Sequence, residues 1–287
     1  MKRNLLFICC LLPLLVACGG KEKSSPSPLE KRVVVTIEPM RYFVESIAGD
    51  RFQVTTMTPP GASPELYEPT PQQMIDLSHA RAYIRVGTLG FERTKLQKVA
   101  DNAPHLYVVD SSKGIQLLPH ADCCDVAAGG DPHTWMSLRN AKVIGRNIFK
   151  ALCEIDPDGV NLYTKRLHVL ENRLDSLDSL VKSRIELVDH RTFLIHHPAL
   201  GYFARDYGLK QLSVEHNGKE PSAEHTAHLI EDCKAEDVKV VFIQKEYTGK
   251  MARRIAEEVG ADVVEINLLS YDWEKEILRI ADMLVHE

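Results

Sequence analysis

The sequence predicts an α/β fold: two α/β domains with mainly parallel sheets, joined by one long rigid connecting helix. Three observations predict it. Short β-branched runs alternate with helical stretches early in the chain, the same alternation returns later, and a helical segment without internal proline separates the two sets. Strands that alternate with helices are typical of parallel sheets with covering helices. A chain of 287 residues with 44% hydrophobic residues can bury a substantial core.

Eight runs are expected to be strands. Four belong to an N-terminal domain at 32–155, and they lie at 33–37, 52–58, 82–87 and 106–110. Four belong to a C-terminal domain at 190–287, and they lie at 192–196, 209–215, 238–244 and 262–267.

The connecting helix is expected at 156–189. Its apolar residues fall near helical spacing, at Leu162, Leu167, Leu170, Leu174, Leu177 and Val181. At 1.5 Å per residue, about 30 residues span roughly 45 Å, which is longer than a small domain is wide. A coiled coil is the alternative, but the apolar heptads are few and imperfect.

The N-terminus predicts export. Lys2 and Arg3 precede an apolar run that is too short to span a bilayer comfortably, so residues 1–17 are expected to be a signal peptide. The tail of this run, LVAC, resembles a bacterial lipobox, in which Cys18 would be lipidated. An uncleaved membrane anchor is the alternative. The polar segment 18–31 is then a lipidated flexible tether in the cell envelope, facing the periplasm or the exterior.

Charge and cysteine content narrow the function classes. A net charge of −5 without a dense basic stripe argues against nucleic acid as a partner. Beyond the signal peptide and the lipidation site, the remaining cysteines are Cys123, Cys124, Cys153 and Cys233. Disulfides are compatible with an exported protein, but the sequence assigns no pairing. No CxxC pair exists, so neither a thiolate zinc site nor a thioredoxin-like centre is indicated.

Metal-binding atoms follow several predicted strand ends, where open α/β sheets bind ligands. The segment PPGASPELYEPTPQQM offers Glu65 and Glu68, and Thr70 is expected to cap a helix that begins at Pro71. His133 lies in the segment GGDPHTWMSLRNA, and two adjacent histidines lie in the segment TFLIHHPALGYF. The last predicted strand ends in the segment EINLLSYDW. A strand sends neighbouring side chains to opposite faces, so the adjacent histidines are not expected to serve one site together.

These segments resemble the metal-receptor proteins of bacterial ABC importers for zinc and manganese, over nearly the whole mature chain. That family supplies histidines in PG…P-H-x-Y-E-P-T-P and D-P-H-x-W, a third ligand in H-x-A-x-G-Y-F-x-x-x-Y-G-L, and an aspartate in D-P-L-x. Here the motifs read PGASPELYEPTP, DPHTW, HPALGYFARDYGL and NLLSYDW. The resemblance implies that His133 and His197 are metal ligands. His196 is expected to face the opposite side as a half-buried structural histidine.

This chain departs from the family at two ligand positions, where Glu65 replaces a histidine and Asn267 replaces the aspartate. The resemblance therefore implies a metal site of Glu65, His133 and His197. Its fourth ligand is the amide oxygen of Asn267, a water or Glu246. Zinc accepts such nitrogen and oxygen ligands, and imidazole outnumbers carboxylate here, so a zinc ion is expected. Manganese or iron is the alternative.

Two further groups could bind metal. The segment 117–130 lies where many zinc receptors of this family carry a histidine-rich loop, and it contains His120, Asp122, Cys123, Cys124 and Asp125. Adjacent cysteines chelate one ion poorly, so a plain exposed loop is favoured over an auxiliary metal site. His216, His225 and His228 are expected to be solvated surface residues.

The expected function is capture of a divalent metal ion between the domains and its delivery to an ABC transporter permease in the inner membrane, by a receptor that is a monomer. A zinc hydrolase is disfavoured, because the sequence has no HExxH, no GxSxG and no Gly-rich phosphate loop. An adhesin is a further alternative. A stiff linker predicts small domain movements, with release triggered by a local loop shift near His133 or Glu65.

Overall fold

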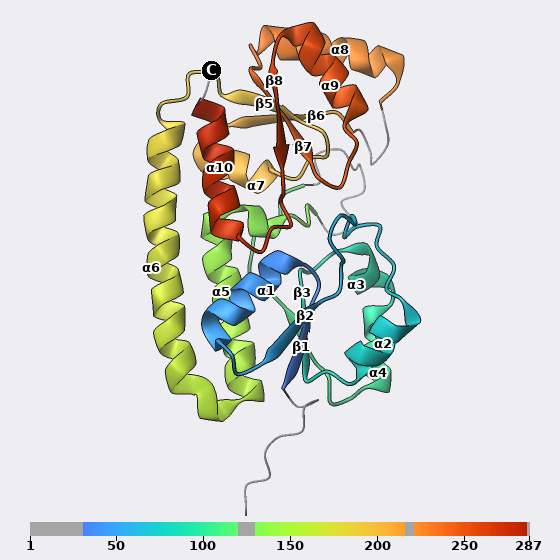
Figure 1. The fold of residues 1–287 in the computed structure, drawn as a ribbon, viewed down its shortest axis with the longest axis vertical. Helices are drawn as coiled ribbons and strands as arrows, with labels where there is room; N and C mark the ends of the chain where they lie inside the picture. The colour runs from blue at the N-terminus through green and yellow to red at the C-terminus, as the bar shows by residue number, and fades with distance from the viewer. Residues whose placement is uncertain (1–30, 120–129, 216–220, 286–287) are drawn as a thin grey trace, which may run out of the picture.

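The computed structural model describes residues 31–119, 130–215 and 221–285. It shows two lobes stacked along the long axis of the molecule, each built on a parallel sheet, with one long helix running beside both (Figure 1). The fold class predicted from the sequence is confirmed. The predicted signal peptide, Cys18, most of the segment 117–130, and His216 lie outside the described residues.

The N-terminal lobe holds a four-stranded sheet in the order β2-β1-β3-β4. Its strands are β1 (Arg32–Val35), β2 (Gln53–Thr56), β3 (Ala82–Arg85) and β4 (Tyr107–Asp110). Its helices are α1 (Glu38–Ala48), α2 (Pro71–Ser78), α3 (Gly90–Thr94), α4 (Leu96–Asn102) and α5 (Leu138–Ile155), with a 3₁₀ turn, η2 (Thr134–Met136), before α5.

The C-terminal lobe repeats this topology in the order β6-β5-β7-β8. Its strands are β5 (Thr192–Ile195), β6 (Lys210–Ser213), β7 (Val240–Gln244) and β8 (Asp262–Ile266). Its helices are α7 (Gly201–Tyr207), α8 (Ala223–Ala235), α9 (Lys250–Val259) and α10 (Trp273–Val285). All eight strands overlap their predicted runs and pair in parallel.

Helix α2 begins where the sequence predicts. The Thr70 hydroxyl accepts a hydrogen bond from the Gln73 backbone N–H, and the Gln73 side chain accepts one from the Thr70 N–H at 2.9 Å. Pro71 takes the first helical position, where no N–H partner is needed. This reciprocal cap fixes the far end of the loop that carries Glu65.

The connecting helix is α6 (Val160–Ile185), entered through a 3₁₀ turn, η3 (Pro157–Gly159). It lies alongside both lobes in Figure 1 and packs against α1, α5 and α10. Most of the predicted inward positions are buried, but Leu162 is 38% exposed. Tyr163 takes the inward position in that turn, because it lies two helical turns before the buried Leu170.

One hydrophobic core runs through both lobes. It joins side chains from both sheets with α1, α5, α6 and α10, while two smaller clusters lie under α2–α4 and under α8 and α9. Two hydrogen bonds donated by indole N–H groups cross the junction of the lobes within this core. Trp135 donates to the Leu268 carbonyl at 3.0 Å, and Trp273 donates to the Trp135 carbonyl at 3.1 Å. The lobes are therefore held together by packing as well as by the connecting helix.

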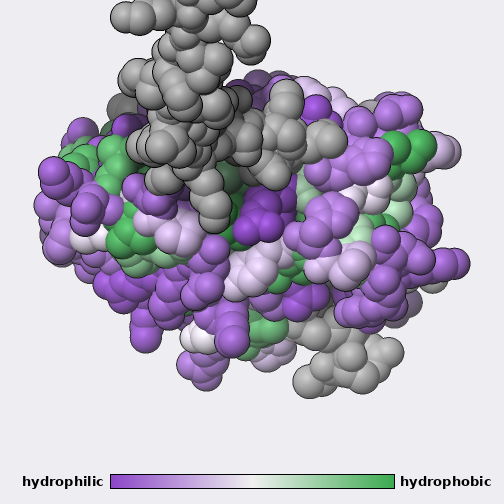
Figure 2. Space-filling view, turned by 90° about the horizontal axis from the view of Figure 1, so that it is seen from below, coloured by the Kyte–Doolittle hydropathy of each residue, from purple (hydrophilic) through white to green (hydrophobic). Residues whose placement is uncertain are grey.

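On the face seen from below in Figure 2, the coloured surface is predominantly hydrophilic, and hydrophobic residues appear in separate patches. Across the described residues, no helix has the length and apolar content needed to cross a membrane.

Two leucines on α6 test this placement of the connecting helix. Leu174→Ala removes a fully buried side chain from the shared core, so the free energy of unfolding should fall by about 2–5 kcal/mol. Leu180→Ala, on the same helix but 39% exposed, should change it by about 0.5 kcal/mol or less. Urea unfolding followed by circular dichroism measures both. Equal losses would contradict the orientation of α6.

Candidate metal centre

A small buried cavity lies between the lobes, at the carboxyl ends of their strands. It is lined by residues that follow β2, β4, β5, β7 and β8. They include Ser63, Glu65, His133, His197, Glu246, Tyr247 and Leu268. Parallel sheets gather the loops after their strands at one edge, and here the two edges meet.

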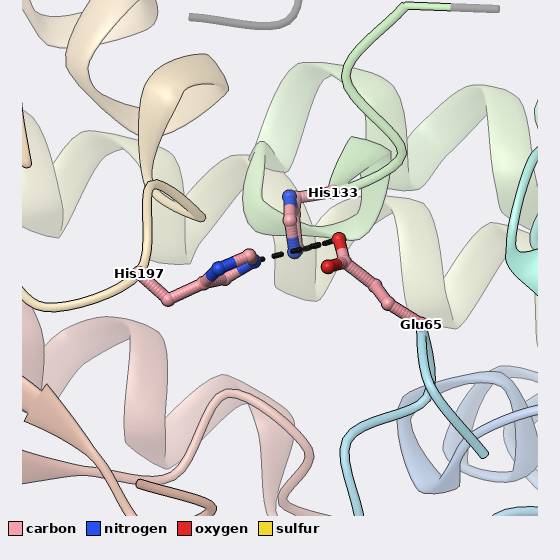
Figure 3. Close-up of side chains that lie close together, drawn as sticks. All are labelled: Glu65, His133 and His197. Carbon is pink, nitrogen blue, oxygen red and sulfur yellow. Dashed lines mark ion pairs between the residues drawn. The ribbon is translucent and has the colours of Figure 1, made fainter. Parts of the chain in front are cut away.

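Three predicted ligands converge in this cavity. Nε2 of His133 lies 3.5 Å from Oε1 of Glu65, and Nε2 of His197 lies 3.4 Å from the same oxygen. One donor atom from each of the three residues lies within 4.8 Å of the other two. Figure 3 shows the side chains pointing toward one another from three separate segments, two in the N-terminal lobe and one in the C-terminal lobe. Such a group can hold one metal ion.

Each imidazole is oriented by a carboxylate on its other nitrogen. Nδ1 of His133 donates to Oδ1 of Asp131 at 2.8 Å, and that oxygen also accepts the His133 backbone N–H at 2.8 Å. Nδ1 of His197 donates to Oε2 of Glu215 at 2.6 Å. Ionised carboxylates only accept hydrogen bonds, so the Nδ1 atoms carry protons and the Nε2 atoms face the cavity. Histidine ligands of metals in proteins are typically held in this way.

The environment of His197 favours its protonated form in the absence of metal. Burial lowers the pKa of His197, but the hydrogen bond to Glu215 and the negative charge of Glu65 outweigh burial and raise the pKa to about 9. At neutral pH a proton therefore occupies Nε2, which is buried and lies 3.4 Å from Oε1 of Glu65. A metal ion that binds there must replace this proton.

The two candidate protein side chains for the fourth ligand lie in different places. Glu246 lines the cavity with the three converging side chains. Asn267 does not. It lines a neighbouring cavity of about 390 Å³ that also contacts Glu246. Strand β8 ends at Ile266. Beyond it, Leu268 and Leu269 line the cavity that holds the three converging side chains, and Asn267 does not.

His196 differs partly from its expected role. It is outside the converging group, as predicted, but it is only 6% exposed and not half-buried. Strand β5 ends at Ile195, so both histidines lie in the bend that follows and strict alternation no longer applies. Both rings pack against Tyr247, with centroid distances of 4.9 Å for His196 and 5.4 Å for His197.

Two residues of the site were not identified from the sequence, namely Glu215 and Tyr247. Glu215 follows β6, which pairs with β5, and its backbone N–H bonds to the His196 carbonyl. Tyr247 stacks on His197 with an interplanar angle of 17°. The available signal for Glu215 was its position as the last residue of the predicted strand at 209–215, but only the strand order places it beside His197.

The other candidate groups lie apart from the cavity. His228 is exposed on α8, with Nδ1 3.7 Å from Oε2 of Glu231, as expected for a surface residue. His225 lies on the same helix. Cys153 and Cys233 are free thiols, whereas Cys123 and Cys124 lie outside the described residues.

The class of protein is a two-lobed metal receptor. It is defined by two parallel-sheet lobes with a long helix beside both, and by imidazole and carboxylate donors that converge at the junction of the lobes. Comparison with known proteins identifies the family. The family model described as ZnuA, the periplasmic component A of zinc-uptake complexes, matches residues 33–279. The chain belongs to this family, so the resemblance found in its motifs is confirmed.

Relatives in this family are named for different metals. The high-affinity zinc uptake system protein ZnuA of Bacillus subtilis (strain 168) is 28% identical over 279 residues, which cover 92% of this chain and 88% of the relative. The iron-binding protein YfeA of Yersinia pestis is 27% identical, covering 91% and 85%. The manganese-binding lipoprotein MntA of Halalkalibacterium halodurans is 26% identical, covering 90% and 86%. A crystal structure of ZnuA matches with a TM-score of 0.83 at 33% identity, over 88% of this chain and 97% of that one.

The raised pKa of His197 predicts a measurable titration. In the metal-free protein, NMR should show the His197 ring titrating with a pKa of about 9, and Glu215→Gln should lower that pKa. The folded-state pKa exceeds that of an unfolded histidine, about 6.5. Protonated His197 therefore stabilises the metal-free fold fully below about pH 6.5, and this contribution is lost as the pH rises through 9. A wild-type ring that titrates near 6.5 would contradict the assigned contacts.

Proposed function

We propose that this protein captures a divalent metal ion, with zinc as its main cargo, and delivers it to an ABC transporter permease in the inner membrane. Glu65, His133 and His197 are the proposed ligands. The observation that carries the proposal is their convergence across the junction of the lobes, with Nε2 of both imidazoles aimed at one carboxylate oxygen.

The spacing of the donor atoms supports zinc. With bonds of about 2.0–2.1 Å, the ligand atoms of a tetrahedral zinc site lie roughly 3.3–3.4 Å apart. The two nitrogen-to-oxygen distances, 3.5 and 3.4 Å, are close to this value. Both histidine nitrogens therefore already lie at nearly the spacing from the Glu65 oxygen that a tetrahedral zinc site requires.

The size of the cavity supports a low coordination number. Its volume is about 30 Å³. A cavity of roughly 10–15 Å³ is enough to hold one water. An ion with three protein ligands would leave room for about one water, or for the Glu246 carboxylate, as fourth ligand. Manganese and magnesium sites commonly take six oxygen-rich ligands, for which this cavity is small. Manganese or iron remains the alternative cargo, because relatives are named for both.

The shared core supports release by a local movement. Wide separation of the lobes would break the buried indole hydrogen bonds of Trp135 and Trp273, whereas Glu65 lies on a loop at the cavity wall. A permease that displaced this loop would remove one ligand and leave the histidines in place. Lipidation at Cys18, which would tether the protein to a membrane, and a monomeric state complete the proposal.

Alanine substitutions test the ligand set. Removing the ring of His133 or His197 should weaken zinc binding by orders of magnitude, because each ring supplies one of three protein ligands. His196→Ala, the matched control beside His197, should cost far less, since its ring is outside the converging group. Isothermal titration of demetallated protein with zinc, manganese and iron measures affinity and preference together. Equal losses from His196→Ala and His197→Ala would refute the assignment.

Glu65→Gln tests the residue at which this chain departs from the family motif. The amide keeps the size of the side chain but loses the charge, so zinc affinity should fall clearly while the metal-free fold is retained. Unchanged affinity in the same titration would mean that the carboxylate of the site is Glu246 and not Glu65.

A further inference from the structure

The loop between β2 and α2, which carries Glu65, has few internal constraints. Within it, short turns join Ala62 to Pro59 and Tyr67 to Ser63 through backbone hydrogen bonds. Leu66, next to the proposed ligand, is 81% exposed and supplies no packing. Contacts outside the loop therefore contribute to the position of the Glu65 backbone.

One contact outside the loop is with Gly90, the first residue of α3. A Cβ atom built on Gly90 would lie 2.6 Å from the Glu65 carbonyl oxygen, a distance that real Cβ atoms essentially never show. Gly90 does not have a positive φ, so its backbone conformation does not require glycine. Because Gly90 has no side chain, the Glu65 backbone can pack directly against the start of α3. An ion pair between Lys95 and Glu68 holds the same loop against the end of α3.

A buried carboxylate anchors α3 to the sheet. Glu92 is 3% exposed, and it accepts hydrogen bonds from the Val86 N–H at 2.8 Å and the Gly87 N–H at 2.7 Å. It also accepts one from the Thr36 hydroxyl, which lies just after β1. A buried charge is costly unless it is hydrogen-bonded, and here three donors satisfy it. Glu92 therefore fixes α3 to the ends of two neighbouring strands, β1 and β3.

We infer that α3 is the support that positions Glu65 as a metal ligand, with Gly90 and Glu92 as positioning residues. Glu92 fixes α3 to the sheet, and Gly90 transmits that fixed position to the Glu65 backbone. Neither residue touches the ion. This inference rests on the proposed function, in which Glu65 is a ligand, and adds the part of the fold that sets its geometry.

The test is Gly90→Ala, read by metal affinity and by the visible absorption of bound Co²⁺, which reports coordination geometry. The added methyl group should push the Glu65 backbone away, weaken zinc and Co²⁺ binding about 10- to 100-fold, and change the Co²⁺ spectrum. Gly145→Ala is the matched control. Its Cβ would meet only Leu170 and Leu167 on α6, at ordinary contact distances of 3.5 and 3.7 Å.

A double-mutant cycle separates positioning from a general loss of stability. If Gly90 acts through Glu65, then Gly90→Ala should have little further effect on metal affinity in a Glu65→Gln protein. Equal effects in both backgrounds would overturn the inference. Glu92→Gln is a second variant, because its amide sets N–H groups against a backbone donor. Glu92→Gln should also weaken zinc and Co²⁺ binding. It should change the Co²⁺ spectrum in the wild-type background but not in the Glu65→Gln background.

The outcomes distinguish this inference from the proposed function. If Glu65→Gln leaves affinity and spectrum unchanged, the proposed ligand set fails. If Glu65→Gln weakens binding but Gly90→Ala leaves affinity and spectrum unchanged, the inference fails and the ligand set stands. A Gly90→Ala protein that loses its helical circular dichroism also overturns the inference, because the clash would then be absorbed by the whole lobe and not by the loop.

Discussion

Two indole N–H groups tie the lobes together at the level of the metal cavity, one from Trp135 to Leu268 and one from Trp273 to Trp135. Both bonds lie within a core that continues from one sheet to the other. A rotation that opened the junction would leave buried donors and acceptors unpaired, at about 1–3 kcal/mol for each group. The proposed ligands come from both lobes, so their separation depends on this closed junction. The packing of the junction thus holds the proposed ligands near one another.

Charges of both signs are packed around the cavity. Glu65, Asp131 and Glu215 bring three carboxylates close to two imidazoles. Mutual repulsion of the carboxylates would favour opening, but protonated His197 lies between Glu65 and Glu215 and offsets part of it. A bound cation would take over the role of this proton with a larger charge. The carboxylates on Nδ1 thus orient both imidazoles, and in the proposed function a proton and a metal ion are alternative occupants of Nε2 of His197.

The sequence was sufficient to predict the strands, the connecting helix, the Thr70 cap and the convergence of Glu65, His133 and His197. Each of these depends on local patterns or on the family motifs. What the sequence could not give depends on tertiary arrangement. Glu215 lies beside His197 because β6 pairs with β5 and Ser213 is in register with Ile195, and no local pattern encodes that pairing. Asn267 lines a different cavity, because the chain turns after β8 and directs Leu268 inward.

The placement of the aromatic residues gives this protein a built-in optical reporter. Its sequence contains only two tryptophans, and both lie at the junction of the lobes. The Trp135 ring lies 5.2 Å from that of His133, and the Trp273 ring stacks on Tyr42 of α1 at 5.9 Å. Tryptophan emission, excited selectively over tyrosine, therefore originates beside the proposed metal site and where the lobes meet. The intensity and wavelength of this emission would report metal binding and changes at the junction of the lobes in real time, without a dye attached to the surface.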